Sequence, residues 1–432
     1  MSTYHFLFDL AVILLSTKLL GLVTRKFHMP QVVGALLAGL VLGPAMLNVI
    51  SETEFIQDTA EIGVIILMFC AGMETDIKEL KKSGRASLVI ALIGVIVPLI
   101  GGYFVAYAFN RPGMIESDAA GSIFLQNVFI GIILTATSVS ITVETLKELG
   151  KLKTRSGNAI LGAAIIDDIL GIIALTIITS MADSGVSIVL VLLKMAAFFV
   201  FAAVAGVLFY HFYIRWSERA QKGMHRHAIV AFVFCLLLSY VAEAGFGVAD
   251  ITGAFIAGVI ISCTQKSQYL TSKFDVLSYL YLSPIFFASI GLKVKLPQMN
   301  GVIIGFAAAL VLTAILTKIV GCGLGAKLCG YQNYQCMRIG VGMISRGEVA
   351  LIVASKGTAL GLMGTDFLGP VVVVVVITTI ITPVLLKYVF KKGGASVPLT
   401  EEKSFSSNYE EVQNYREGGK LVQQDGSRER RG

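Results

Sequence analysis

The sequence has few charged residues, a single tryptophan and five histidines among its 432 residues. Charged residues make up 15% of the chain and hydrophobic residues 55%, whereas a soluble protein carries about 25% charged residues. This balance argues against a soluble enzyme, a disordered chain and a nucleic-acid-binding protein. None of the six cysteines forms a CxxC pair, so neither a structural zinc site nor a disulfide framework is expected.

Motifs typical of enzymes and of ion-channel filters are also missing. The chain contains no P-loop, no GxGD motif and no TVGYG-like filter segment. An intramembrane aspartyl protease needs two aspartates on separate helices, whereas Asp167 and Asp168 are neighbours. No enzymatic activity, no cofactor and no nucleic-acid partner are therefore predicted.

Long apolar runs dominate what is present. A membrane-spanning helix needs about 20 mostly apolar residues, and we count thirteen such segments, which predict an all-α polytopic membrane protein. They cover residues 5–24, 28–47, 58–74, 86–109, 124–146, 157–181, 188–213, 228–245, 249–264, 277–292, 301–326, 338–359 and 366–390. The polar residues 391–432 are expected to form a short, disordered cytoplasmic tail after a transmembrane domain of residues 1–390.

Basic residues indicate the orientation of these segments. The loops on one side hold most of the Lys and Arg residues, while the alternate loops hold only Arg111, Lys293, Lys295 and Lys356. Because cytoplasmic loops are rich in Lys and Arg, we expect the N-terminus outside and the C-terminus in the cytoplasm of a cell that carries the protein in its plasma or inner membrane. The net charge of +7 is then mostly a topology signal.

An internal repeat relates the two halves of the chain. The run VVGALLAGLVLG (32–43) resembles DITGAFIAGVII (250–261), and LMFCAGME (67–74) resembles IFFASIGLK (285–293) with one inserted residue. The matched segments are an odd number of helices apart, so the repeats have opposite topology. Inverted repeats of this kind are typical of secondary transporters.

Ionisable and polar residues lie near the middle of four of these segments. They are Asp167 and Asp168 in 157–181, Lys318 in 301–326, Arg346 and Glu348 in 338–359, and Thr137 and Ser138 in 124–146. At 1.5 Å per helical residue they lie about 12–15 Å from the cytoplasmic helix ends, near the centre of a core about 30 Å thick. Charges at this depth are functional by default.

Segments 124–146 and 338–359 each interrupt an apolar run with polar residues, TATS in one and SRGE in the other. We interpret both as discontinuous helices that cross at a cavity. Arg346 and Glu348 would then neutralise half-helix ends. The alternative is an unbroken helix whose Ser and Thr side chains bond to their own backbone.

The adjacent aspartates suggest competitive binding. Two like charges a few ångströms apart in low dielectric cannot both ionise freely, so a cation and a proton become exclusive occupants of one carboxylate. Oxygen ligands suit hard alkali cations. Lys318 could pair with the other aspartate and be released when the ion binds, or its side chain could extend to the inner surface.

At these residues the sequence resembles sodium/proton antiporters of the monovalent cation:proton antiporter-2 family. The resemblance covers nearly all of residues 5–390 and includes RKFHMPQVVGALLAGLVLGP (25–44), GVIILMFCAGME (63–74), TATSVSIT (135–142), AAIIDDILG (163–171), SPIFFASIGL (283–292) and SRGEVALI (345–352). It implies a thirteen-helix fold, a homodimer and an elevator-like movement. Core helices would cover about 58–181 and 277–390, and dimerisation helices about 5–47 and 188–264.

The resemblance also implies roles for individual residues. In the family's electrogenic members the second aspartate carries the ion, here Asp168, while the first, here Asp167, pairs with a lysine, here Lys318. Thr137 and Ser138 would lie beside the ion. The implied activity is electrogenic exchange of Na⁺ or Li⁺ for H⁺. K⁺/H⁺ exchange is the alternative within the family, and a cation channel is the alternative of another class.

Overall fold

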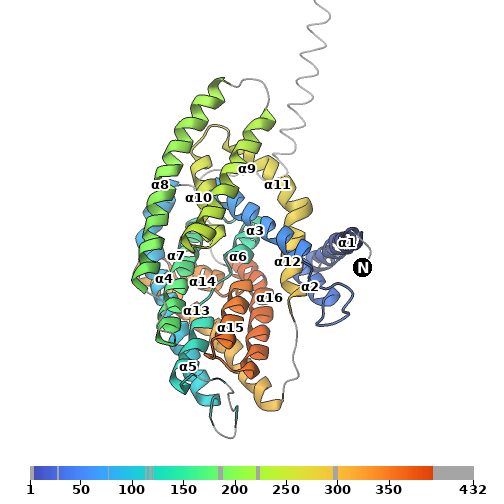
Figure 1. Ribbon diagram of the computed structural model, residues 1–432, viewed down its shortest axis with the longest axis vertical. Helices are drawn as coiled ribbons and strands as arrows, with labels where there is room; N and C mark the ends of the chain where they lie inside the picture. Colours follow the sequence, from blue (N-terminus) through green and yellow to red (C-terminus); the bar gives the residue numbers. More distant parts are fainter. Residues whose placement is uncertain are drawn as a thin grey trace, which may run out of the picture.

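The long apolar runs form helices in the computed structural model, and the described residues contain no strand (Figure 1). The structure describes residues 4–26, 29–75, 77–111, 114–115, 119, 121–182, 188–219, 224–294 and 300–392. Nine helices in this part of the chain are long and apolar enough to cross a membrane. The predicted all-α membrane fold is confirmed, while the count of thirteen spans stays a prediction and most of the 391–432 tail lies outside the described residues.

The helices follow one another with short connections. The α-helices are α1 (His5–Lys26), α2 (Gln31–Leu42), α3 (Glu54–Glu74), α4 (Ile77–Phe109), α5 (Ile123–Ile133), α6 (Val139–Glu148), α7 (Arg155–Ala182), α8 (Ile188–Arg219), α9 (Met224–Tyr240), α10 (Asp250–Ser262), α11 (Ser267–Leu277), α12 (Ser283–Leu292), α13 (Gly301–Leu328), α14 (Asn333–Gly342), α15 (Glu348–Ala359) and α16 (Leu368–Lys392). Two π-helical turns, η1 (Val241–Phe246) and η2 (Ser278–Leu282), extend α9 and join α11 to α12, and a 3₁₀ turn, η3 (Thr365–Phe367), precedes α16.

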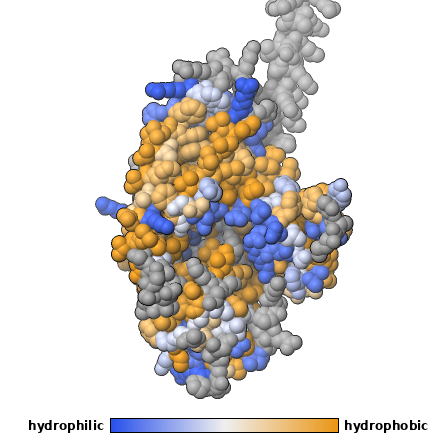
Figure 2. Space-filling model, viewed as in Figure 1, coloured by the Kyte–Doolittle hydropathy of each residue, from blue (hydrophilic) through white to orange (hydrophobic). Residues whose placement is uncertain are grey.

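Apolar side chains cover much of the outer surface. On α8, Leu193, Val200 and Leu208 are each about two-thirds exposed. Figure 2 shows large hydrophobic areas on the visible face, with hydrophilic side chains gathered between them near α3 and α12. Such a surface is stable in lipid, because apolar side chains contact the hydrocarbon and each helix satisfies its own backbone hydrogen bonds.

The helices pack in two groups. The crossing bundle consists of α4–α7 and α13–α16, in which α4 packs along α13, α7 and α5, and α13 packs along α14 and α16. The flanking bundle consists of α1–α3 and α9–α12, in which α3 packs along α10 and α2 along α1 and α12. The long helix α8 contacts α7 and α10 and lies along the side of both groups (Figure 1).

The inverted repeat is visible in the flanking bundle. A Cβ built on Gly39 of α2 would lie 1.9 Å from the Ala288 carbonyl oxygen of α12. A Cβ built on Gly258 of α10 would lie 2.2 Å from the Phe69 carbonyl oxygen of α3. Gly258 and Ala288 follow Gly39 and Phe69 by the same 219 residues, so equivalent positions of the two repeats make equivalent backbone contacts. Small residues permit this close approach, as in other membrane helices.

We expect Gly258→Ala to destabilise the flanking bundle. The added methyl group meets rigid backbone on α3, and overpacking of this kind costs about 1–3 kcal/mol. Thermal unfolding of the purified protein in detergent measures the effect. Gly84→Ala is the matched control, because no atom lies within 4 Å of a Cβ at that exposed position of α4. Equal unfolding temperatures for the two variants would contradict the close contact.

Candidate cation site

Two helices are interrupted at the centre of the crossing bundle. The chain is non-helical between α5 and α6, at residues 134–138, and between α14 and α15, at residues 343–347. The predicted discontinuities are confirmed, and the alternative of two unbroken helices is wrong. The Ser138 N–H donates to the Ser345 carbonyl at 2.7 Å, and the Ser345 hydroxyl donates to the Ser138 carbonyl at 2.8 Å. The two unwound segments therefore satisfy part of each other's backbone.

A second hydroxyl, that of Thr142, also stabilises this crossing. Thr142 of α6 donates to the Gly342 carbonyl at 2.7 Å, and its oxygen lies 2.8 Å from the Ser345 hydroxyl. The Ser138 hydroxyl is 3.2 Å from that of Ser140. These side chains are all buried, so their hydrogen bonds are made away from water and hold the crossing in one arrangement.

Arg346 neutralises the end of a half-helix. Its fully buried guanidinium donates to the carbonyl of Leu134, which caps α5, at 2.6 Å, and to that of Ile344 at 2.7 Å. A cation at a helix C-terminus is electrostatically favourable. The Thr379 hydroxyl of α16 donates to the Arg346 carbonyl. Glu348 is the first residue of α15, but its side chain lies outside the described part of the structure.

Asp167 and Lys318 form a buried ion pair. The Lys318 Nζ lies 3.1 Å from both carboxylate oxygens of Asp167, and neither side chain is more than 1% exposed. Lys318 therefore does not extend to the inner surface. Such a pair is held at high desolvation cost, and removing one partner leaves an uncompensated charge.

Asp168 lies in a different environment from its neighbour. Adjacent helical residues point about 100° apart, so Asp167 faces Lys318 while Asp168 is partly exposed. Both aspartates line a cavity of about 480 Å³. The structure thus separates a buried carboxylate that is paired with Lys318 from a partly exposed one.

Thr137 and Ser138 do not occupy equivalent positions. The Thr137 hydroxyl faces the Asp167 carboxylate but is buried outside hydrogen-bonding geometry. The Ser138 hydroxyl is committed to Ser140. Neither residue lines the cavity, whereas Thr135 and Ala136 of the same unwound segment do. The sequence singled out Thr137 and Ser138 of this segment, whereas Thr135 and Ala136 are the ones that line the cavity.

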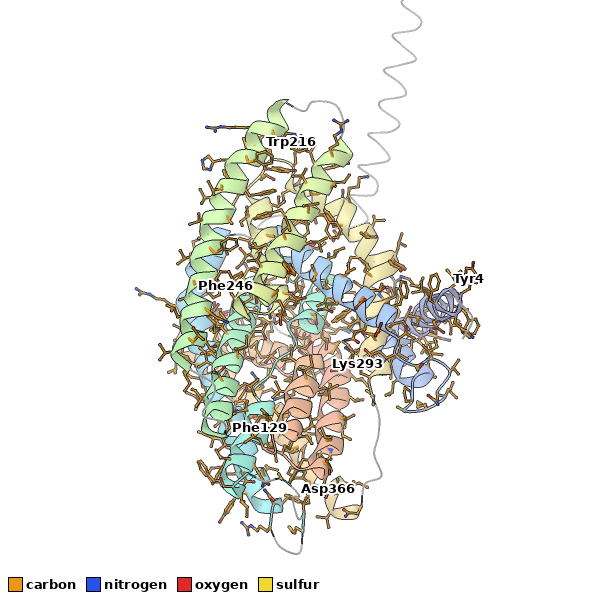
Figure 3. All side chains as sticks on the ribbon, in the orientation of Figure 1. Tyr4, Phe129, Trp216, Phe246, Lys293 and Asp366 are labelled. Atoms are coloured by element: carbon orange, nitrogen blue, oxygen red, sulfur yellow. The ribbon has the colours of Figure 1, made fainter. Side chains whose placement is uncertain are left out.

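The cavity reaches the surface at the end of the flanking bundle where α3 begins. Its mouth lies at the start of α3, the end of η1, the start of α10 and the end of α12, and includes Gln57, Glu61, Glu243, Asp250 and Lys293. Glu61 and Glu243 are exposed there. Figure 3 labels Lys293, which follows the end of α12 and lies near the middle of the molecule along its long axis. Toward the other end of α7, residues 156–164 are all buried, so the described part of the chain closes off α7 from solvent on that side.

The acidic mouth was not predicted. Glu61 and Glu243 lie near helix ends, where a carboxylate is ordinarily solvated. The repeat offered no signal for them, because the residues 219 positions away, Leu280 and Thr24, are not acidic. In the described part of the chain, no group of three or more His, Cys, Asp or Glu side chains is arranged to hold a metal ion. The site therefore consists of two carboxylates, a lysine and the neighbouring polar backbone.

A model of the sodium/hydrogen exchanger transmembrane family matches residues 11–392. The chain belongs to this family. The exchanger is 40% identical over 390 residues to the Na⁺/H⁺-K⁺ antiporter GerN of Bacillus cereus, covering 90% of this chain and 97% of the relative. It is 36% identical over 399 residues to the Na⁺/H⁺ antiporter of Enterococcus hirae, covering 90% and 99%. Among solved structures, the sodium proton antiporter MjNhaP1 of Methanocaldococcus jannaschii matches with a TM-score of 0.64 and 19% identity over 90% and 97% of the two chains, which shows a shared fold.

Proposed function

We propose that this exchanger transports Na⁺ or Li⁺ in exchange for H⁺, with Asp168 as the group for which cation and proton compete. The observation that carries the proposal is the pair of adjacent carboxylates that line one cavity, of which Asp167 is buried against Lys318 and Asp168 is partly exposed. The names of the two relatives support Na⁺ as a substrate. The Thr137 hydroxyl, which faces Asp167 although it does not line the cavity, would supply a further oxygen ligand to a cation bound between the two carboxylates.

Charge counting at these three residues gives an electrogenic cycle. With Na⁺ bound by both carboxylates and Lys318 released as a neutral amine, the site carries a net charge of −1. With Asp168 protonated and Lys318 protonated against Asp167, the site is neutral. One cycle therefore exchanges two protons for one Na⁺ and moves one net charge. Because the Asp168 carboxylate holds either Na⁺ or a proton, cation and proton occupancy exclude each other.

Alternating access requires one group of helices to move past the other. We propose that the crossing bundle moves, since it carries both aspartates, Lys318 and the unwound segments. The sequence placed residues 58–74 and 277–292 with the moving core. The backbone contacts of α3 with α10, and of α12 with α2, favour their staying with the flanking bundle. A homodimer through the flanking bundle, and termini placed as the basic loops predict, complete the proposal.

The alternatives make different predictions. One observation favours K⁺/H⁺ exchange, because the name of the Bacillus cereus relative includes K⁺. A channel needs a path open at both ends, whereas residues 156–164 close one end here. The absence of a filter segment from the sequence agrees with a transporter.

A cation series in proteoliposomes tests the proposal. The protein is reconstituted with an internal pH dye and an imposed proton gradient, and Na⁺, Li⁺ or K⁺ is added with and without a potassium-diffusion potential. We expect dequenching with Na⁺ and Li⁺, and a rate that changes with the potential. Dequenching by K⁺ alone would favour K⁺/H⁺ exchange, and cation flux without proton movement would favour a channel.

A further inference from the structure

An ion-pair cluster lies at the opposite end of α3 from the cavity mouth. We call this side, on which residues 156–164 are buried, the closed end. Lys147, in the last turn of α6, lies 3.2 Å from Glu74 at the end of α3 and pairs directly with Asp275 of α11. The three side chains are only 16–24% exposed. Ion pairs that are partly removed from water are screened less by salt than surface pairs.

This cluster joins the two bundles. Lys147 belongs to α6, which the Thr142 and Ser345 hydrogen bonds tie to the unwound segments, whereas Glu74 and Asp275 belong to the flanking bundle. The next residue, Glu148, accepts hydrogen bonds from the Gln31 N–H at 2.8 and 2.9 Å, at the N-terminus of α2. The last turn of α6 is therefore held by the flanking bundle on two sides.

The inverted repeat provides a comparison at the open end. Lys293 of the second repeat follows Glu74 by the same 219 residues as the glycine pairs. Lys293 lines the cavity mouth and pairs at 3.4 Å with Glu52, which precedes α3 within the flanking part of the chain. Equivalent positions thus bridge the two bundles at the closed end and stay within one bundle at the open end. The ion pair between the two bundles is therefore found on the side where the cavity is closed.

We propose that Lys147, Glu74 and Asp275 form an ionic latch that holds the crossing bundle against the flanking bundle while the cavity faces the opposite side. The inference rests on the proposed alternating access. Opening the closed end separates α6 from α3 and α11, so Lys147 must leave both carboxylates. Glu148 must also leave the N-terminus of α2. The latch stabilises the state seen here and slows the opening of the other side.

A native cysteine reports on the latch. Cys70 of α3 is fully buried and faces both Lys147 and Asp275, so separation of α6 from α3 exposes it. Cys235 of α9 is also fully buried but lies within the flanking bundle. The test uses reconstituted protein in which the other four cysteines are replaced by serine, and it measures the rate at which a water-soluble maleimide modifies each remaining thiol.

We expect Lys147→Gln to raise the modification rate of Cys70 about tenfold or more, because partly buried carboxylates lose their cation, and to leave Cys235 unmodified. Glu74→Gln and Asp275→Asn should raise the rate less, and Lys147→Arg should keep it near that of the unsubstituted protein. Lys391→Gln, which changes an exposed lysine at the end of α16, is the matched control.

The two thiols separate latch release from unfolding. Modification of both Cys70 and Cys235 in Lys147→Gln shows global unfolding, and the milder Glu74→Gln and Asp275→Asn variants then decide the question. An unchanged Cys70 rate in these folded variants overturns the latch. Loss of Na⁺-dependent proton movement in the unsubstituted protein would instead refute the proposed function, so the two failures are distinguishable.

Discussion

Asp168→Asn is expected to reduce Na⁺-dependent proton movement in proteoliposomes to the level of empty vesicles. The amide neither binds a proton near neutral pH nor supplies the negative charge that a cation needs, so both competing occupants are lost. Asp168 is the partly exposed carboxylate of the cavity, and the change leaves the buried pair of Lys318 with Asp167 in place. We therefore expect the protein to unfold at the same temperature or at a slightly higher one.

The control for this variant is Asp366→Asn. It makes the same substitution at an exposed position of η3, far along the bundle from the cavity mouth (Figure 3). Exchange by Asp366→Asn should match that of the unsubstituted protein. If Asp168→Asn retained exchange at that rate while Asp167→Asn abolished it, the assignment of the carrier would have to be reversed.

Lys318→Gln is expected to have the second largest effect, on both stability and voltage response. Removing the lysine leaves Asp167 buried without its cation, and breaking a buried pair in this way costs about 3–5 kcal/mol. Glutamine also cannot deliver the second proton of the proposed cycle. Any exchange that remains should be electroneutral, with a rate that an imposed diffusion potential no longer changes.

Two further variants separate these effects. Asp167→Asn combined with Lys318→Gln removes both charges and should restore most of the unfolding temperature without restoring the response to the potential. Lys194→Gln, at an exposed position of α8, should change neither property. A Lys318→Gln protein that still responds to the potential would show that the lysine takes no part in charge movement.

Much of the fold could be predicted from the order of apolar and polar residues along the sequence. Apolar length predicted the spanning helices, and the 219-residue repeat matched Gly39 with Gly258, which make equivalent backbone contacts in the structure. The TATS and SRGE interruptions predicted the unwound crossing, because each places polar residues within an apolar run, where freed backbone groups must face a cavity or other protein groups. The depth of Asp167, Asp168 and Lys318 placed them in one layer of the membrane.

The site itself could be predicted only in part. Depth along a helix says which residues share a layer but not which faces meet. The sequence therefore left open whether Lys318 would contact an aspartate or extend to the surface. It also treated Thr137 and Ser138 alike, although the turn between α5 and α6 directs the first toward Asp167 and the second toward Ser140. Glu61 and Glu243 gave no signal, because their meeting at one mouth depends on the packing of α3 beside α10.

The sequence by itself determined the class of protein, its helical segments, its repeat and the residues that carry charge into the membrane. These properties depend on hydrophobicity and spacing, which are local. The resemblance implied that Asp167 pairs with Lys318, but only the tertiary structure showed that this pair is buried while Asp168 is partly exposed, and that Lys147 bridges the two bundles. Those outcomes depend on which helix faces which, and the free energy of a buried charge is set by the partners that packing brings within a few ångströms of it.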